Sequence, residues 1–207
     1  MKVVVIVSPA LKEELAGTNF SGQADIEWVA EPSNIEDADI VVDFLFTDSK
    51  NRIEELQKSA ARCILVNHVS GTSQSLPANF TRFNGWPGFM SGAVVEAASN
   101  NTQFHHEVET VFTLFNRKVK WVPDSPGFVT ARVVAMIINE AYLALGEGVS
   151  SRKDIDTAMK LGTNYPFGPF EWVEKIGLSH VHQLLVELAR THKRYQPAAL
   201  LTQEALS

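Results

Sequence analysis

The chain has 207 residues, of which 45% are hydrophobic and 20% charged, and its formal charge is -6. This composition is typical of a packed globular protein and excludes intrinsic disorder, while the net acidity argues against nucleic-acid binding. A single cysteine excludes a disulfide framework. The sequence has no signal-peptide pattern, and no apolar run approaches the roughly 18 residues of a membrane helix, so we expect a soluble, cytoplasmic protein.

The first part of the chain alternates between strand and helix patterns. Residues 3–7, VVVIV, form a continuous apolar, β-branched run that is typical of a strand buried on both faces. Further strands are predicted at 26–30, 38–46, 63–66, 81–84 and 118–122, and helices at 9–16 (ending at Gly17), 50–61 and 100–115. This alternation predicts a mostly parallel, doubly wound sheet over residues 1–123.

From Asp124 onward the sequence predicts helices only. Residues 128–145 are apolar nearly all round, which indicates a helix buried on several sides, and we expect this helix to form a homodimer interface. Later helices are expected to begin at Ser151, Pro169, Ser179 and Pro197, with a stop at Gly162 and an apolar stripe of Val181, Leu184, Leu185 and Leu188. The predicted fold class is therefore an α/β domain over 1–123 followed by an all-α domain over 124–207.

Five motifs of the second domain occur in a fixed order. They are DSPGFV at 124–129, NEA at 139–141, DIDTAMKLG at 154–162, YPFGPFE at 165–171 and IGL at 176–178. Their order and spacing resemble the C-terminal domain of 3-hydroxyacyl-CoA dehydrogenases, a helical domain of the 6-phosphogluconate dehydrogenase C-terminal type. The resemblance implies a Rossmann-like first domain that binds NAD and a cleft in which an acyl-CoA packs against the helical domain. In that family a His is the general base, a Glu orients it, and a Ser and an Asn hold the substrate oxygen.

The first domain resembles the family more loosely. The segment 64–71, ILVNHVSG, is similar to the strand and loop that carry the catalytic Ser, which places that role on Ser70. The strand ADIVVDF is similar to the one with an acidic residue near the cofactor, here Asp43, and Glu31 stands where an acidic side chain accepts ribose hydroxyls. The expected substrate-cleft residues are Asn84, Trp86 and Arg132.

Several positions depart from the family pattern. A dinucleotide-binding turn needs glycines for its tight bend and for backbone contact with the pyrophosphate, yet the turn at 8–11 is Ser-Pro-Ala-Leu. Pro9 also removes an amide that could bind phosphate. Thr81 or Arg82 stands where the family's base is, and Ala131 stands where its oxyanion Asn is. Losing the general base alone costs about 100- to 10,000-fold in rate.

Two residues are candidates to replace the missing base. His68 lies two residues before Ser70, and Glu96 belongs to a Val-Glu element similar to that of the family. The simpler interpretation of His68 is a hydrogen-bonded residue at the end of a strand. The loop 85–92 (GWPGFMSG) is interpreted either as an aromatic-walled anion site at a helix N-terminus or as a tight loop whose Trp86 closes the core. No spacing of His and Cys predicts a metal site.

Three functions are compatible with these observations. The first is a diverged relative that keeps the fold, the cleft and the dimer without NAD-dependent dehydrogenase activity, and binds an acyl-CoA-like ligand or a partner. The alternative is an active NAD(P)-dependent 3-hydroxyacyl-CoA dehydrogenase of fatty-acid metabolism, in which His68 or Glu96 has taken over as base. The third is an enzyme of another class that reuses the cleft. The missing glycines, general base and oxyanion Asn favour the diverged relative without dehydrogenase activity. Compared with the family, the chain is short, and the shortfall lies in the first domain, which binds the nucleotide in that family.

Overall fold

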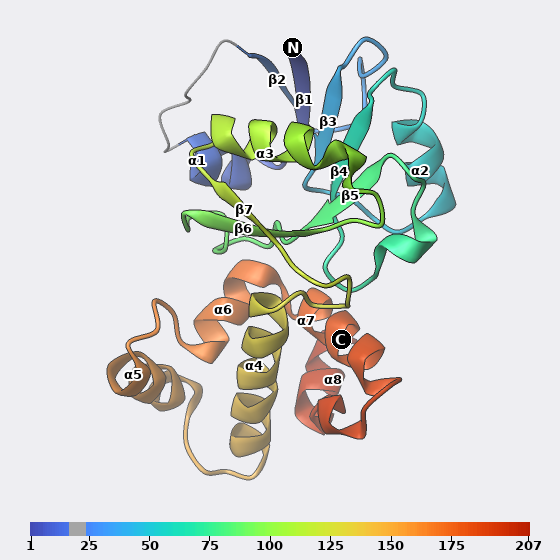
Figure 1. Ribbon diagram of the computed structural model, residues 1–207. Helices are drawn as coiled ribbons and strands as arrows, with labels where there is room; N and C mark the ends of the chain where they lie inside the picture. Colours follow the sequence, from blue (N-terminus) through green and yellow to red (C-terminus); the bar gives the residue numbers. More distant parts are fainter. Residues whose placement is uncertain (17–23) are drawn as a thin grey trace. The chain divides into compact units, whose positions relative to one another are not determined.

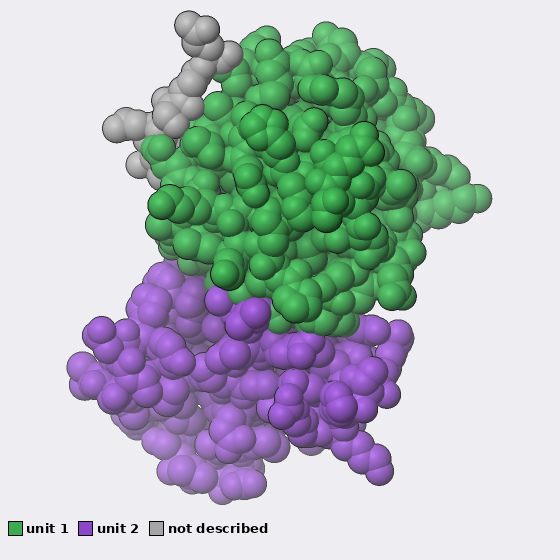
Figure 2. All heavy atoms as spheres, in the orientation of Figure 1, with its two compact units in different colours: residues 1–128 green, residues 129–207 purple. Residues whose placement is uncertain are grey.

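The structure is a computed structural model that describes residues 1–16 and 24–207 (Figure 1). The chain divides into two compact units, Met1–Phe128 and Val129–Ser207, which are coloured separately in Figure 2. The predicted boundary between residues 123 and 124 therefore falls inside unit 1. Gly17, the expected end of the first helix, lies outside the described residues.

Unit 1 contains a seven-stranded sheet with the order β2-β1-β3-β4-β5-β6-β7. Its strands are β1 (Lys2–Ile6), β2 (Asp25–Val29), β3 (Ile40–Asp43), β4 (Cys63–Asn67), β5 (Phe80–Phe83), β6 (Val94–Ala98) and β7 (Lys118–Trp121). Neighbouring strands are parallel except for the antiparallel pair β5 and β6. The predicted, mostly parallel α/β sheet is confirmed.

Helices cover both faces of this sheet, because strands β1, β3 and β4 are apolar over residues 3–6, 40–42 and 63–66. The helices are α1 (Pro9–Ala16), α2 (Lys50–Leu56) and α3 (His105–Leu114). Val3 and Val5 of β1 pack in one core cluster with residues of α1 and α3, whereas Val4 and Ile6 pack in the other with Leu56 of α2. Alternate residues of a strand point to opposite faces, so a continuous apolar run fills two cores at once.

The largest error in the predicted elements lies after the loop 85–92. We expected a helix there, but Val94–Ala98 is strand β6, which returns antiparallel to β5. The interpretation of the loop as a helix N-terminus is therefore wrong. The second predicted helix is also shorter than expected, since α2 ends at Leu56. The amides of Ala60 and Arg62, in the segment that leads into β4, donate to the carbonyls of Glu36 and Asp39 before β3.

Unit 2 is entirely helical. Its helices are α4 (Thr130–Gly146), α5 (Arg152–Thr163), α6 (Pro169–Ile176), α7 (Leu178–Ala189) and α8 (Ala199–Ala205). The Ser151 side chain accepts a hydrogen bond from the Asp154 amide and caps α5, and Pro169 opens α6, both as predicted. Within the described ranges, none of the helices has the length and apolarity needed to cross a lipid bilayer.

Other helix ends differ from the sequence prediction by a few residues. The helix α5 passes Gly162 and ends at Thr163, and its C-cap residue Asn164 adopts the left-handed conformation with φ 56°. The helix α7 begins before Ser179, with Gly177 at its N-cap, and α8 begins after Pro197. Short polar residues and glycines are acceptable at several adjacent positions, so the sequence pattern locates a helix end only approximately.

One contact explains why a glycine precedes α6. Gly168 is the N-cap residue but has no side chain, and the Asp156 carboxylate of α5 instead accepts a hydrogen bond from the Phe170 amide at 2.8 Å. Glu171 completes the cap, since its carboxylate accepts from the Gly168 amide at 2.9 Å. A Cβ at position 168 would lie 2.3 Å from the Asp156 carboxylate oxygen. Glycine is therefore needed for α5 to cap its neighbour.

We expect Gly168→Ala to lower the free energy of unfolding by about 1–3 kcal/mol, because the added methyl group displaces the Asp156 cap. Thermal and urea denaturation of the whole chain would measure this. Gly162→Ala is a matched control, since nothing lies within 4 Å of its Cβ position. That substitution should stabilise the chain by ~0.5–1 kcal/mol through the higher helix propensity of alanine. Equal effects of the two substitutions would contradict this assignment.

Candidate functional site

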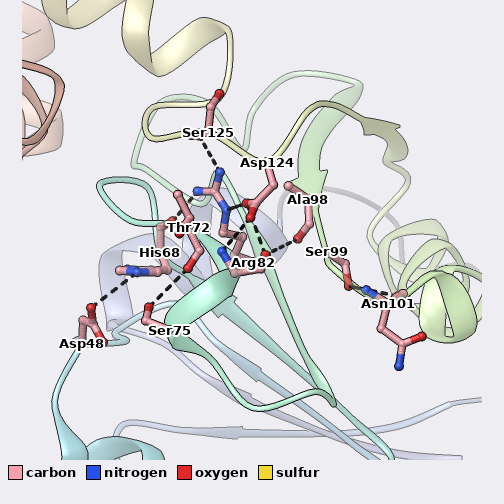
Figure 3. Close-up of polar contacts among 11 residues, drawn as sticks. Asp48, His68, Thr72, Ser75, Arg82, Ala98, Ser99, Asn101, Asp124 and Ser125 are labelled. Atoms are coloured by element: carbon pink, nitrogen blue, oxygen red, sulfur yellow. Dashed lines mark hydrogen bonds and ion pairs between the residues drawn. The ribbon is translucent and has the colours of Figure 1, made fainter. Parts of the chain in front are cut away.

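Arg82 is the buried centre of a polar cluster in unit 1, which we call the Arg82 cluster (His68, Ser73, Arg82, Asp124 and Ser125). Figure 3 labels His68, Arg82, Asp124 and Ser125. The Arg82 side chain is 0% exposed. The Arg82 Nε donates to the Asp124 carboxylate at 2.6 Å, one terminal nitrogen to the His68 carbonyl at 2.9 Å, and the other to the Ser125 carbonyl at 2.5 Å. These bonds join strand β5 to the loop after β4 and to the segment after β7.

The segment 124–128 belongs to unit 1 because of this cluster. Asp124 also accepts from the Ser73 amide at 2.9 Å, and the Phe128 ring lies 4.1 Å from the Arg82 guanidinium carbon. Gly127 and Phe128 both have positive φ values, 82° and 49°. A left-handed Phe is unfavourable by itself, so the contacts with Arg82 hold this turn in place.

Arg82 cannot serve as a general base. Burial lowers the pKa of Arg82, and the Asp124 carboxylate opposes that shift. An arginine stays protonated in proteins and has no lone pair to accept a proton. Arg82 thus has a structural role, and Thr81, the other residue that the resemblance places at the position of the family's base, is 0% exposed. The sequence indicates the role of Arg82 by placing a charged residue in the short strand segment FTRF. All four residues of that strand are buried in the structure.

His68 and Ser70 lie in the loop directly after β4. His68 is 6% exposed, its Nε2 is 3.6 Å from a carboxylate oxygen of Asp48, and its ring packs edge-on against Phe46 (Figure 3). Burial lowers the pKa of His68, although the nearby Asp48 opposes this. The imidazole is therefore neutral at pH 7. Ser70 is half-buried two residues later.

Glu96, Asn84 and Trp86 come together on strands β5 and β6 and the loop that joins them. The Asn84 side-chain amide donates to the Glu96 carboxylate at 3.4 Å, and the two residues are 3% and 8% exposed. The Trp86 amide donates to the Asn84 side-chain oxygen at 3.4 Å, and the Trp86 ring is 5% exposed. Glu96 thus contacts an amide in this structure, and Trp86 fills the interior of the chain.

The expected cofactor residues Asp43 and Glu31 are linked by Arg52, which sequence reasoning missed. Asp43 is 0% exposed and accepts from the Arg52 Nε at 2.8 Å and from a terminal nitrogen at 3.0 Å. Burial raises the pKa of Asp43, and Arg52 opposes the shift. Another terminal nitrogen of Arg52 is 3.8 Å from the Glu31 carboxylate, whose side chain is 81% exposed. Asp43 therefore faces an arginine, whereas Glu31 faces solvent.

The turn between β1 and α1 uses two of the first amides of the helix. The Ser8 hydroxyl accepts from the Leu11 amide at 3.3 Å, the Ser8 carbonyl accepts from the Lys12 amide at 2.9 Å, and Pro9 has no amide proton. Fewer donors are therefore left for a pyrophosphate at this helix N-terminus.

The loop 85–92 crosses the carboxyl ends of β3 and β4 and reaches α1. The Gly85 amide donates to the Asn67 side chain at 2.9 Å, and that side chain donates to the Phe44 carbonyl at 3.1 Å. At Gly88, which has φ 88°, the amide lies 3.2 Å from both carboxylate oxygens of Glu14 in α1. Open α/β sheets bind dinucleotides at the carboxyl ends of strands where the strand order reverses, here between β1 and β3.

In unit 2 the matched polar residues have structural contacts. The Arg132 guanidinium lies 5.9 Å from the centroid of the Tyr195 ring. Asn139 of the NEA motif donates to the Gln196 carbonyl at 3.0 Å and accepts from the Ala198 amide at 2.8 Å, which fixes the approach to α8. Across residues 1–16 and 24–207, no group of three or more His, Cys, Asp or Glu could hold a metal ion.

Comparisons with known proteins agree with the motifs. Residues 127–206 match the family described as 3-hydroxyacyl-CoA dehydrogenase, C-terminal domain. The chain is 34% identical over 194 residues to a 3-hydroxyadipyl-CoA dehydrogenase of Escherichia coli, with 90% of this chain and 40% of the relative covered. It is 33% identical over 178 residues to a 3-hydroxybutyryl-CoA dehydrogenase of Clostridioides difficile, with 79% and 59% covered.

The chain therefore spans 40% and 59% of the lengths of these two relatives. Among solved structures, an (S)-3-hydroxybutyryl-CoA dehydrogenase of Ralstonia eutropha has the same fold, with a TM-score of 0.72 at 22% identity, and the match covers 98% of this chain and 92% of that one. On the motifs, the helical-domain match and these relatives, the chain belongs to the 3-hydroxyacyl-CoA dehydrogenase family.

Proposed function

We propose that this chain is a family member that binds an acyl-CoA-like ligand and does not carry out NAD-dependent oxidation of it. The observation that carries the proposal is that the resemblance places Thr81 or Arg82 at the position of the general base, and both are 0% exposed. Thr81 is not a base at neutral pH, and Arg82 is a hydrogen-bonded cation. The ligand class comes from the relatives, whose names give CoA thioesters as substrates.

Oxidation of a 3-hydroxyl group needs an acceptor for the hydroxyl proton and a nicotinamide that accepts the hydride. The residues at the expected NAD site do not fit that cofactor. The β1–α1 turn has no glycine and the Ser8 hydroxyl accepts from the Leu11 amide, the Asp43 carboxylate is bound by Arg52, and the loop 85–92 is anchored across the strand ends by Asn67. Glycines in that turn are what lets the pyrophosphate approach the backbone in the usual binding mode.

A panel of thermal shifts with NADH, NADPH, CoA and acetoacetyl-CoA tests the proposal. We expect no shift with either nucleotide and a rise in melting temperature with the CoA compounds, since a ligand at 100 times its Kd stabilises by about 2.7 kcal/mol. We also expect no oxidation of 3-hydroxybutyryl-CoA above that of a Ser70→Ala control. Saturable NADH binding or turnover above the control would refute the proposal, and the absence of any shift with CoA compounds would favour a protein partner instead.

The neutral imidazole of His68 favours a second candidate, an active dehydrogenase with a rearranged base. A neutral histidine near the Ser70 loop is a chemically competent proton acceptor. On this alternative, wild-type protein oxidises 3-hydroxybutyryl-CoA, and His68→Gln loses about 100- to 10,000-fold of that rate while keeping the affinity for the CoA compounds. The two functions thus differ in the wild-type turnover itself.

A further inference from the structure

The segment between α7 and α8 carries a local excess of positive charge. Residues 190–194 read RTHKR, all of them are exposed, and no acidic residue occurs between Glu187 and Glu204. The formal charge of -6 falls on residues 1–128, because residues 129–207 contain equal numbers of acidic and basic residues. Together with one side chain of α4 this segment forms a group that we call the basic cluster. Its members are Arg132, Arg190, His192, Lys193 and Arg194.

Tyr195 brings three members of the basic cluster together. Its side chain is 2% exposed. The guanidinium carbon of Arg194 lies 4.6 Å from the centroid of the Tyr195 ring, and that of Arg132 lies 5.9 Å from it. The centroid of the His192 ring is 6.3 Å from the same point. Two guanidinium groups and an imidazole, contributed by α4 and by the segment before α8, therefore converge on one buried ring.

The backbone that presents the basic cluster is fixed. Lys193 and Arg194 belong to a short 3-10 turn, Lys193–Tyr195. Directly after this turn, the Asn139 side chain of α4 donates to the Gln196 carbonyl at 3.0 Å and accepts from the Ala198 amide at 2.8 Å. Cations held on a fixed turn lose less conformational freedom on binding than cations on a loose segment, so the cluster is preorganised.

Lys193 and Arg194 have no acidic partner within residues 1–16 and 24–207. The ion pair of the segment is that of Arg190, whose terminal nitrogen is 2.7 Å from the Glu187 carboxylate. Arg194 instead donates a hydrogen bond to the Tyr195 hydroxyl. Positive charges that are held near one another repel, and a bound anion removes that repulsion. The arrangement therefore favours an anionic ligand.

We propose that the basic cluster binds a linear polyphosphate group with a free terminal phosphate. Arginine presents its N–H groups in a planar fork that matches phosphate oxygens, and lysine adds a compact charge. Cations spread around one ring suit a chain of phosphates better than a single one. A diphosphate that is esterified at both ends, as in dinucleotides and CoA, carries less charge per phosphate and is a poorer match. The site lies in unit 2 and does not depend on the proposed function.

Calorimetric titration of the whole chain with inorganic tripolyphosphate in low salt tests the site. We expect saturable binding that weakens as salt is added, because salt screens exposed charges. Lys193→Glu should raise the Kd about 10-fold or more, since it removes a cation and adds a repulsive charge. Lys153→Glu is the matched control, because it makes the same charge change at an exposed position of α5, which lies apart from α8 in Figure 1. It should raise the Kd less than about 2-fold.

Two results of this titration would overturn the site. One is the absence of saturable binding to the wild-type chain. The other is equal weakening by the two substitutions, which would indicate a general effect of net charge. Circular dichroism of both variants checks that each is folded.

Further ligands identify the source of the polyphosphate. ATP that binds as tightly as tripolyphosphate would assign the site to a nucleoside triphosphate, and ATP that binds at least about 10-fold more weakly would assign it to inorganic polyphosphate. A polyglutamate peptide that binds in preference to both would overturn the proposal in favour of an acidic protein segment. The thermal-shift panel above contains neither ATP nor tripolyphosphate, so the two proposals can fail separately.

Discussion

Replacing Arg82 with alanine is expected to lower the free energy of unfolding by about 3–5 kcal/mol. The substitution removes the cation from Asp124 and leaves the buried carbonyls of His68 and Ser125 without their donor. It also removes the guanidinium that packs on Phe128, whose left-handed backbone then has less support. A typical domain is stable by only about 5–15 kcal/mol, so this variant should lose a large share of its stability.

Urea denaturation of the full chain, followed by circular dichroism, would measure the loss. Arg62→Ala is the matched control, because Arg62 is exposed in the same unit and its removal should change stability by less than about 0.5 kcal/mol. Arg82→Lys should fall between the two, because an ammonium group cannot reach acceptors in the directions that a planar guanidinium serves. A loss below ~1 kcal/mol in Arg82→Ala would show that the Arg82 cluster does not hold the segment 124–128.

Replacing Arg52 with alanine is expected to cost a similar ~3–5 kcal/mol at pH 7. Asp43 is 0% exposed and would remain as a buried carboxylate that accepts a hydrogen bond from the Leu45 amide at 2.9 Å. The double variant Asp43→Asn with Arg52→Ala should recover part of the loss, because it removes the buried charge as well as its partner. Glu54→Ala, at an exposed position of the same helix, is the control and should change little.

The loss in Arg52→Ala should shrink as the pH falls. Burial already raises the pKa of Asp43, and removing Arg52 raises it further because the remaining shift is desolvation. A carboxyl whose folded pKa is raised above the unfolded value destabilises the fold once the pH exceeds that unfolded value of about 3.9. Denaturation at pH 4.5 should therefore show a smaller difference from wild type than at pH 7. A difference that is the same at both pH values would argue against an ionised Asp43.

Most of the fold follows from local patterns in the sequence. The run of residues 3–7 predicts a strand buried on both faces, and the change of periodicity at Asp124 predicts the helical part. The stripe of α7, which contains Val181, Leu184, Leu185 and Leu188, is buried as expected. These signals are readable because they depend on residues close together in the chain. Strand β6 was missed because VVEAA is short and suits a helix or a strand equally well until β5 and β7 flank it.

The sequence by itself predicted the fold class and the family, and it showed that the turn at 8–11 lacks the glycines of a dinucleotide-binding turn. The tertiary structure decided what the remaining polar residues do. Arg82 meets Asp124 across 42 residues of chain and Asp43 meets Arg52 across nine. Gly168 has to be a glycine because Asp156 of another helix occupies the space of its Cβ. Such roles depend on which groups share a buried site after folding. A charged group that water solvates in the unfolded chain needs a hydrogen-bonding or oppositely charged partner in the protein interior. A local sequence pattern does not identify that partner.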